Sequence, residues 1–238
     1  MATTQWLRAV GHTLLDLLYP LRCAGCGQPG TSYCSDCRDA APRVLLPICP
    51  LCGQTQERME LCARCAGEPL RIDGIRSVAL FEGTLRQAIH RFKYRSARDL
   101  AAPLGEMIAD FWREHPLSAD LIVPVPLHAR RLKERGYNQA QLLADQLGGA
   151  IGITVAGDVL RRTRYTMAQA RLDGGQRRQN VQGAFLCQDS RVRDRPVLLI
   201  DDICTTGATL ESCSVALREG GACSVWALTL ARTPYSSI

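Results

Sequence analysis

The sequence lacks the long uninterrupted apolar stretch that a membrane-spanning helix or a signal peptide would require. Residues 1–22 carry leucine and valine at a helical spacing, but His12 and Asp16 interrupt them. A membrane-spanning helix needs about 20 predominantly apolar residues, and a signal peptide needs an unbroken apolar core. We therefore expect an N-terminal helix that neither spans a membrane nor directs export, and a cytoplasmic location.

Aromatic residues are also scarce, at 5% of the chain, so stacking of nucleic-acid bases has few candidate residues. Tyr94, Tyr137, Tyr165 and Trp112 lie among arginines and lysines, as in proteins that bind single strands, although each suits the packing of a core equally well. Acidic residues are few between 127 and 195, where six Asp or Glu accompany 13 Lys or Arg. This local positive charge favours an anionic partner such as a phosphosugar, pyrophosphate or nucleic acid.

Cysteine, by contrast, is abundant, and eight of the twelve cysteines form four Cys-x-x-Cys pairs. In a reducing compartment such pairs indicate structural zinc rather than disulfides, with redox cysteines or an iron–sulfur cluster as alternatives. The simplest assignment joins neighbouring pairs within a small module over residues 1–70, although the spacing does not exclude an interleaved pairing. The expected ligands of two zinc ions are Cys23, Cys26, Cys34, Cys37, Cys49, Cys52, Cys62 and Cys65. The other four, Cys187, Cys204, Cys213 and Cys223, are expected to be small core residues.

From residue 71 the pattern predicts a second domain of alternating strands and helices, extending to residue 238. Strands are expected at 76–82, 119–126, near Val159, and at 184–186, 197–201 and 224–231, with helices from about Leu85 to Arg113 and from Thr209 to Glu219. This alternation is typical of an α/β fold with a parallel sheet, whose ligands bind at the carboxyl ends of the strands.

The segment VLLIDDICTTGAT, residues 197–209, has the composition of a phosphosugar site. Its apolar residues form a buried strand that is expected to deliver Asp201 and Asp202 to the strand's tip. The small residues Thr205, Thr206, Gly207, Ala208 and Thr209 then lead into a helix, whose N-terminal N–H groups favour a phosphate. The two carboxylates suit ribose hydroxyls or a hydrated Mg²⁺ ion. The alternative is an aspartate-rich cap before an ordinary helix.

This segment resembles the loop that binds phosphoribosyl diphosphate (PRPP) in type I phosphoribosyltransferases, and the whole chain resembles the ComF family of competence-associated and DNA-utilisation proteins. The matching stretches are residues 81–95, 120–144, 160–185 and 197–222, and the N-terminal module is similar to that family's double zinc ribbon. The resemblance implies a type I phosphoribosyltransferase fold in which Asp201 and Asp202 are the catalytic residues. They would bind PRPP together with residues 205–209.

The resemblance also implies roles for two basic segments. Pyrophosphate would bind at the end of the LIVPVP strand, where the chain turns at 124–127, through Pro126, Leu127, Arg130, Arg131 and Arg135, although a solvated helix face explains any single arginine. Residues 161–180 are polar, basic and contain Gly174 and Gly175, which indicates a mobile loop that could close over PRPP. Its candidate residues are Arg162, Arg164, Gln169, Arg177 and Asn180. The segment Gly136–Gln139 is read as a loop and a helix cap, and Lys93 as a phosphate contact or an extended surface lysine.

Three functions are compatible with these residues. The first is a ComF-type protein that binds PRPP or a related phosphosugar and assists the uptake or handling of single-stranded DNA, in contact with DNA-uptake machinery. The second is an active phosphoribosyltransferase of nucleotide salvage that uses Mg²⁺ with PRPP. The third is a regulator that senses PRPP without turnover. The sequence does not name an acceptor base, because no segment has the pattern of a base-recognition pocket.

Overall fold

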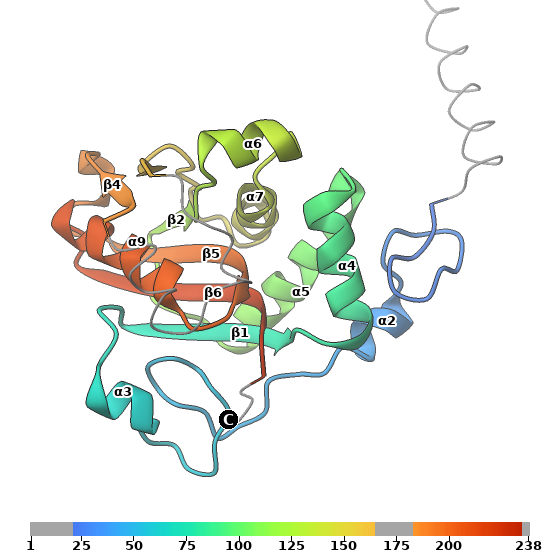
Figure 1. Cartoon of the computed structure of the whole chain (residues 1–238), viewed down its shortest axis with the longest axis horizontal. Coiled ribbons are helices and arrows are strands. Elements are labelled where there is room, and N and C mark those ends of the chain that lie inside the picture. The colour runs from blue at the N-terminus through green and yellow to red at the C-terminus, as the bar shows by residue number, and fades with distance from the viewer. Residues whose placement is uncertain (1–20, 165–182, 235–238) are drawn as a thin grey trace, which may run out of the picture.

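The computed structural model of the chain describes residues 21–164 and 183–234. Its centre is a four-stranded sheet in the order β1 (Gly74–Leu80), β6 (Ser224–Arg232), β5 (Pro196–Cys204) and β2 (Leu121–Pro124), and every neighbouring pair is parallel (Figure 1). The parallel α/β class expected from the sequence is therefore confirmed.

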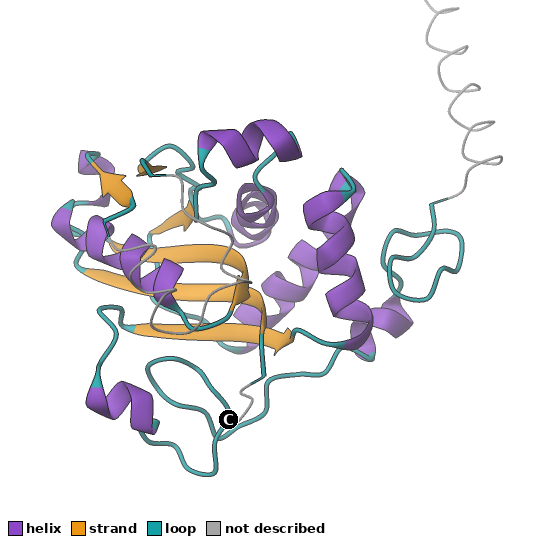
Figure 2. Ribbon diagram, viewed as in Figure 1, coloured by secondary structure: helices purple, strands orange, loops and turns teal. Residues whose placement is uncertain are grey.

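Helices cover both faces of this sheet (Figure 2). The helix α9 (Ala208–Glu219) lies on one face, and α4 (Gly83–Tyr94), α5 (Ala101–Glu114) and α7 (Gln139–Ile151) lie on the other. Successive residues of β5 alternate between the two cores: Val197 and Leu199 pack toward α9, whereas Leu198 and Ile200 pack toward the three helices. Because both faces are covered, β2 and the first half of β5 are continuous apolar runs.

The helical region expected from about Leu85 to Arg113 forms two helices, α4 and α5. It turns at Ser96, whose φ of 52° lies in the left-handed region, and a short 3₁₀ turn η1 (Arg98–Leu100) precedes α5. Pro103 explains the break. Proline has no N–H and clashes with the preceding turn inside a continuous helix, but the first turn of α5 tolerates it.

Two of the expected strands lie outside the main sheet. The strands β3 (Leu160–Arg162) and β4 (Phe185–Cys187) pair with each other antiparallel and contact α9. Each of these strands has three residues. Their buried side chains, Leu160, Phe185 and Cys187, pack in the same core as the buried residues of α9. The connections also contain α6 (Ala129–Arg135) and the 3₁₀ turn η3 (Ser190–Val192).

The cysteine module wraps around the edge of the sheet at β1. Its first part, with α2 (Ser35–Asp39), packs with the core below α4 and α5, and its second part, with α3 (Ala63–Gly67), packs with the core on the α9 side. Between them the chain covers the edge strand, because Ile75 N donates to Leu51 O at 2.8 Å and Leu80 N to Pro42 O at 2.7 Å. The division into two domains at residue 70 stays a prediction.

No helix within residues 21–164 and 183–234 is long and apolar enough to cross a membrane. The expected N-terminal helix lies mostly outside the described residues.

Candidate ligand site and cysteine clusters

The eight paired cysteines form two clusters, grouped as neighbouring pairs. The first cluster is Cys23, Cys26, Cys34 and Cys37, the second is Cys49, Cys52, Cys62 and Cys65, and in each the sulfurs lie within 4.8 Å of one another. Four sulfurs about 2.3 Å from one zinc ion would lie about 3.8 Å apart at the corners of a tetrahedron. The observed Sγ–Sγ distances of 3.6 Å for Cys23–Cys34 and 3.7 Å for Cys52–Cys62 match this spacing. The two clusters therefore fit two structural zinc sites.

Main-chain N–H groups prepare one thiol of each cluster as a metal ligand. Burial alone would raise the pKa of Cys23, but hydrogen bonds from main-chain groups, including Gly25 N and Cys34 N at 3.4 Å, lower it to about 6. In the second cluster the pKa of Cys49 is also lowered to about 6 against the effect of burial, and Cys62 N donates to its sulfur at 3.5 Å. Because the thiolate is the form that binds metal, these contacts favour metal binding at neutral pH.

The acidic pair on β5 lies inside the strand rather than at its tip, which corrects the expectation. Beyond Ile200 the strand loses its neighbour β2 but stays paired with β6, and Asp201 faces Thr229 in that ladder. The strand ends only at Cys204. The reason is that β6 has nine residues and supports β5 to its end, whereas β2 has four. One side of β5 therefore has no strand partner at the acidic pair.

Asp202 is almost completely buried and forms an ion pair that the sequence did not reveal. Its Oδ1 lies 2.9 Å from Nζ of Lys93 on α4, and the two side chains are 3% and 19% exposed. Its Oδ2 is buried without a hydrogen-bond partner among the described residues. Lys93 thus neither reaches outward to a phosphate nor extends along the surface. The only sequence signal was its position on the apolar side of α4, next to the buried Phe92.

Asp201 is half-buried and lies among charges of both signs. Burial, followed by the negative charge of Asp202, raises its pKa to about 7, while Lys93 and Arg162 oppose the shift. Its Oδ1 accepts a hydrogen bond from Asp202 N at 2.8 Å. Burial also lowers the pKa of the Arg162 guanidinium, and the charge of Arg131 lowers it further. Cations from α4 and β3, Lys93 and Arg162, therefore act on this carboxyl group.

The loop Thr205–Thr209 follows the acidic pair and turns the chain into α9. Gly207 has a φ of 83°, a left-handed conformation that glycine adopts without strain, and is the N-cap of the helix. Ala208 N donates weakly to Thr206 Oγ1 at 3.4 Å, and Thr206 O accepts a hydrogen bond from Arg64 Nη1 at 2.7 Å. The loop therefore has the backbone form expected of a turn that could surround an anion.

The residues expected to bind pyrophosphate do not all lie beside the acidic pair. Pro126 and Leu127 follow β2 and are half-buried, and His128 caps α6 by accepting from Arg130 N through Nδ1 at 3.2 Å. The Arg130 side chain donates to Glu134 Oε1 at 3.0 Å, on an exposed face. Arg135 donates to Gln139 and lies near Tyr94. Of the three arginines, Arg131 is the one whose charge is felt by Arg162, near Asp201.

The segment Gly136–Gln139 has a structural role, as the simpler interpretation predicted. Gly136 ends α6 in the left-handed conformation, and the buried Tyr137 donates its hydroxyl to Phe92 O on α4. Asn138 caps α7 by accepting from Ala140 N at 3.1 Å, and its amide donates to Val125 O at 3.1 Å. These contacts fix α6 and α7 against the end of β2.

Of the four aromatic residues considered for base stacking, three lie in the described part of the chain, and they differ in exposure. Trp112 and Tyr137 are buried in the core under α4, α5 and α7, whereas the Tyr94 side chain is 67% exposed. Tyr165 lies outside the described residues, as do Gln169, Arg177 and Asn180 of the expected loop. Arg162 lies in β3 and not in a loop, which corrects the expectation for this residue, and Arg164 follows the strand.

Three of the four remaining cysteines are core residues, as expected. Cys187, Cys204 and Cys213 are buried, and burial raises the pKa of the Cys204 thiol to about 11, which makes it unreactive at neutral pH. The expectation is wrong for Cys223, which is exposed because it lies in the turn before β6.

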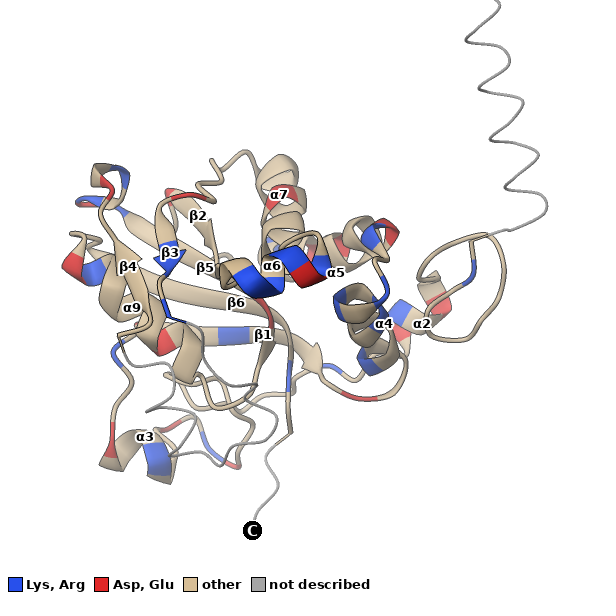
Figure 3. Cartoon of the chain, turned by 45° about the horizontal axis from the view of Figure 1, so that its top comes forward, with Lys and Arg blue, Asp and Glu red and all other residues tan. Residues whose placement is uncertain are grey.

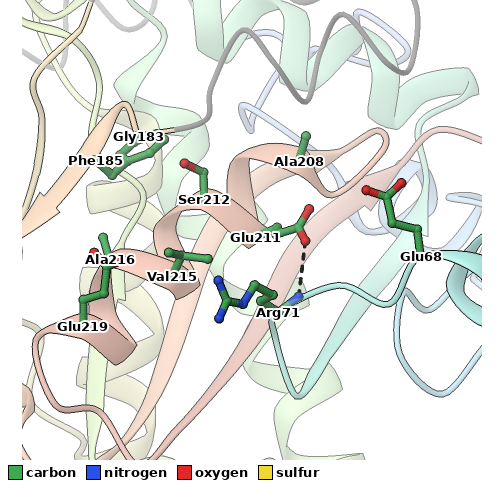
Figure 4. A pocket seen from close by; sticks show the side chains of 10 residues that line it. All are labelled: Glu68, Arg71, Gly183, Phe185, Ala208, Glu211, Ser212, Val215, Ala216 and Glu219. Carbon is green, nitrogen blue, oxygen red and sulfur yellow. Dashed lines mark hydrogen bonds between the residues drawn. The ribbon is translucent and has the colours of Figure 1, made fainter.

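A cavity of about 480 Å³ opens beside α9 (Figure 4). It lies between the chain that leaves the second cysteine cluster, with Glu68 and Arg71, and the outer face of α9, with Glu211 and Glu219. Of the loop 205–209 only Ala208 lines it. Three carboxylates against one guanidinium do not suit a phosphate, so this cavity is distinct from the candidate site at the acidic pair.

Comparison with curated proteins finds relatives along most of the chain. Competence protein F of Haemophilus influenzae is 34% identical over 208 residues, covering 83% of this chain and 90% of that protein. DNA utilization protein YhgH of Escherichia coli O157:H7 is 32% identical over 206 residues, covering 84% and 90%. Competence protein ComFC of Bacillus subtilis is 29% identical over 219 residues, covering 87% and 86%. A family model described as a double zinc ribbon domain matches residues 14–66.

Solved structures with similar folds are more distant. The glutamine PRPP amidotransferase of Bacillus subtilis is 22% identical, covering 58% of this chain and 30% of that one, with a TM-score of 0.40. A purine phosphoribosyltransferase of Pyrococcus horikoshii is 18% identical, covering 57% and 75%, with a TM-score of 0.36. These similarities are too low to indicate a function.

Proposed function

Because this chain belongs to the family of competence protein F and its DNA-utilization relatives, we propose that it binds PRPP or a related phosphosugar and assists the handling of single-stranded DNA. The names of the relatives support the second half of this proposal, and the local geometry at the end of β5 supports the first.

The observation that carries the phosphosugar proposal is the arrangement of Asp201 and residues 205–209 on the side of β5 that has no strand partner beyond Ile200. A left-handed Gly207 starts α9, so the positive end of the helix dipole lies at this loop and favours a phosphate there. Asp201 precedes the loop as a half-buried acceptor for ribose hydroxyls. Asp202 is held by Lys93, so we assign it a supporting role, and Arg131 and Arg162 supply positive charge for a diphosphate.

Mg²⁺ would fit this site as a companion of the diphosphate. It prefers a site with one or two carboxylates completed by phosphate oxygens and water, and Asp201 offers such a carboxylate. When bound, the ion would neutralise charge on the diphosphate.

A surface beside this site suits single-stranded DNA. We define the Tyr94 surface as Tyr94 with His90, Arg95, Arg98 and Arg135. The centroid of the Tyr94 ring lies 4.9 Å from the centroid of the His90 ring. It lies 5.5 Å from the guanidinium carbon of Arg135. The basic residues of α4 and α6 lie close together there (Figure 3). An exposed aromatic ring lets a base stack, and nearby cations attract the phosphate backbone.

A PRPP titration tests the phosphosugar half. We expect isothermal titration calorimetry with Mg²⁺ to give binding in the micromolar range or tighter, weakened at least tenfold by Asp201→Asn. Release of pyrophosphate on adding a panel of bases would identify an active transferase instead of a binding protein. Absence of any heat or thermal stabilisation at millimolar PRPP would contradict the proposal.

Fluorescence anisotropy with a labelled single strand tests the DNA half. We expect Tyr94→Ala to weaken binding about fivefold to tenfold, and Tyr94→Phe to retain most of it, because stacking needs the ring and not the hydroxyl. Affinity should fall steeply with salt, and a duplex should bind less tightly. The matched control is Arg113→Ala on α5, whose side chain is 58% exposed and pairs with Asp110. Equal binding of strand, duplex and heparin would count against a role in handling single strands.

A further inference from the structure

The second cysteine cluster contacts the loop 205–209 directly, through the residue between two of its cysteines. Arg64 lies on α3, between Cys62 and Cys65, and its Nη1 donates to Thr206 O at 2.7 Å. We propose that Arg64 is a positioning residue that couples metal binding at the second cluster to phosphosugar binding at the loop. This inference rests on the proposed function, since it names what orients and regulates the same site.

The contact determines the direction of a phosphate donor. In a trans peptide the C=O and the following N–H point in opposite directions. Because the carbonyl of Thr206 accepts from Arg64 on the second cluster, it points toward that cluster, and the N–H of Gly207 points away from it. The guanidinium also brings a positive charge behind the loop. A charge-assisted hydrogen bond is stronger than a neutral one, so the orientation is firmly held.

Other contacts make the second cluster and the loop one packed unit. Arg232 Nη1 donates to Cys52 O at 2.8 Å, and Arg71 N donates to Glu211 Oε1 at 3.3 Å, as the dashed line in Figure 4 shows. Gly207 lies against Ile75 and Leu70, since a Cβ added there would be 2.9 Å from Ile75 Cδ1. Cys204, just before the loop, belongs to the same core as three cysteines of the cluster. A change in the shape of the second cluster would therefore disturb the residues on which the loop 205–209 packs.

The first cluster provides a matched control on the other side of the molecule. Arg38 follows Cys37 and forms an ion pair with Glu106 on α5. Thr84 and Tyr33 bind the carbonyl of Cys37, and this core lies under α4. Arg38 and Arg64 thus each fix one cluster to the domain, but only the contact of Arg64 reaches residues 205–209.

The first experiment compares Arg64→Gln, Arg64→Lys and Arg38→Gln as full-length, zinc-loaded proteins. We expect Arg64→Gln to weaken PRPP binding about tenfold in calorimetry with Mg²⁺, Arg64→Lys to restore part of the affinity, and Arg38→Gln to leave it unchanged. Hydrogen exchange of the main-chain N–H groups at 205–209 should accelerate in Arg64→Gln while the central strands keep their protection. Equal exchange in Arg64→Gln and the wild type would overturn the inference, even if the wild type binds no PRPP and the proposed function fails.

The second experiment uses the reciprocity of coupled binding. If zinc at the second cluster favours PRPP, then PRPP must favour zinc at that cluster by the same factor. We expect PRPP to raise the affinity for one of two zinc equivalents in equilibrium competition with a chromogenic chelator in the wild type, and to have no such effect in Arg64→Gln. A higher affinity for both equivalents, or for neither while PRPP binds in calorimetry, would contradict coupling through Arg64.

Discussion

Lys93 reaches from α4 to a carboxylate that is removed from water, which makes the pair sensitive to the loss of either partner. Replacing one member of a buried ion pair leaves an uncompensated charge, at a cost of about 3–5 kcal/mol. We expect Lys93→Met to lower the free energy of unfolding by about 3 kcal/mol in urea titrations, and Lys93→Met with Asp202→Asn to recover much of it. Arg113→Met breaks the exposed pair with Asp110 and should cost less than about 1 kcal/mol. Similar losses in the two single variants would contradict this account.

Asp201 should make stability depend on pH near neutrality. Its folded pKa of about 7 lies above the value of about 3.9 for an unfolded chain, so the folded state holds the proton more tightly. Its contribution is complete below pH about 4 and is lost as pH rises through about 7. The charge of Asp202 acts with burial to raise this pKa, while Lys93 and Arg162 oppose the shift.

The measurement is the unfolding free energy of wild type and Asp201→Asn between pH 5 and 8. We expect the wild type to lose stability relative to the variant as pH rises, because asparagine does not titrate. Parallel curves would show that Asp201 keeps an ordinary pKa.

At the scale of elements, the strands that carry the site were predictable and their ends were not. A continuous apolar run such as VLLI predicts a strand that is buried on both faces of a sheet. The residues of β5 and β6 confirm this, because they pack into both cores. The extension of β5 past Asp202 depends on the length of β6, a partner that begins 20 residues after β5 ends. The Lys93–Asp202 pair likewise joins residues far apart in the chain. Periodicity reports local burial only, so it contains no information on such pairs.

The start of α9 can be tested with two glycines that share a conformation. Gly207 and Gly136 have φ values of 83° and 79°, so alanine is strained at both by about 1–2 kcal/mol. A Cβ at Gly136 meets nothing nearer than 3.9 Å, whereas one at Gly207 would be 2.9 Å from Ile75 Cδ1. We expect Gly207→Ala to destabilise the protein by about 1–3 kcal/mol more than Gly136→Ala, because of crowding, and to weaken PRPP binding. Equal unfolding midpoints would mean that Ile75 moves aside freely.

For the whole molecule, the wrapping of the cysteine module around β1 distributes the two clusters between opposite cores. The four Cys-x-x-Cys pairs made the clusters predictable, since ligands two residues apart can share one ion. They did not indicate that one cluster would contact the ligand loop, because that contact joins residues 64 and 206 across the fold. The sequence therefore suggested two equivalent structural sites, whereas the structure gives them different neighbours.

This difference predicts unequal effects of losing each metal. Cys37→Ser and Cys65→Ser should each remove about one zinc equivalent, and each should lower the melting temperature, because Cys37 and Cys65 are buried in separate cores. At temperatures below the unfolding transition, Cys37→Ser should keep its affinity for PRPP. The reason is that the cluster containing Cys37 contacts Tyr33, which is bonded to Thr84, and does not contact the loop 205–209. Cys65→Ser should lose affinity about tenfold, because α3 carries Arg64. Zinc analysis, thermal unfolding and PRPP calorimetry on both variants decide the matter, and an equal loss of affinity in both would show that the clusters act only through global stability.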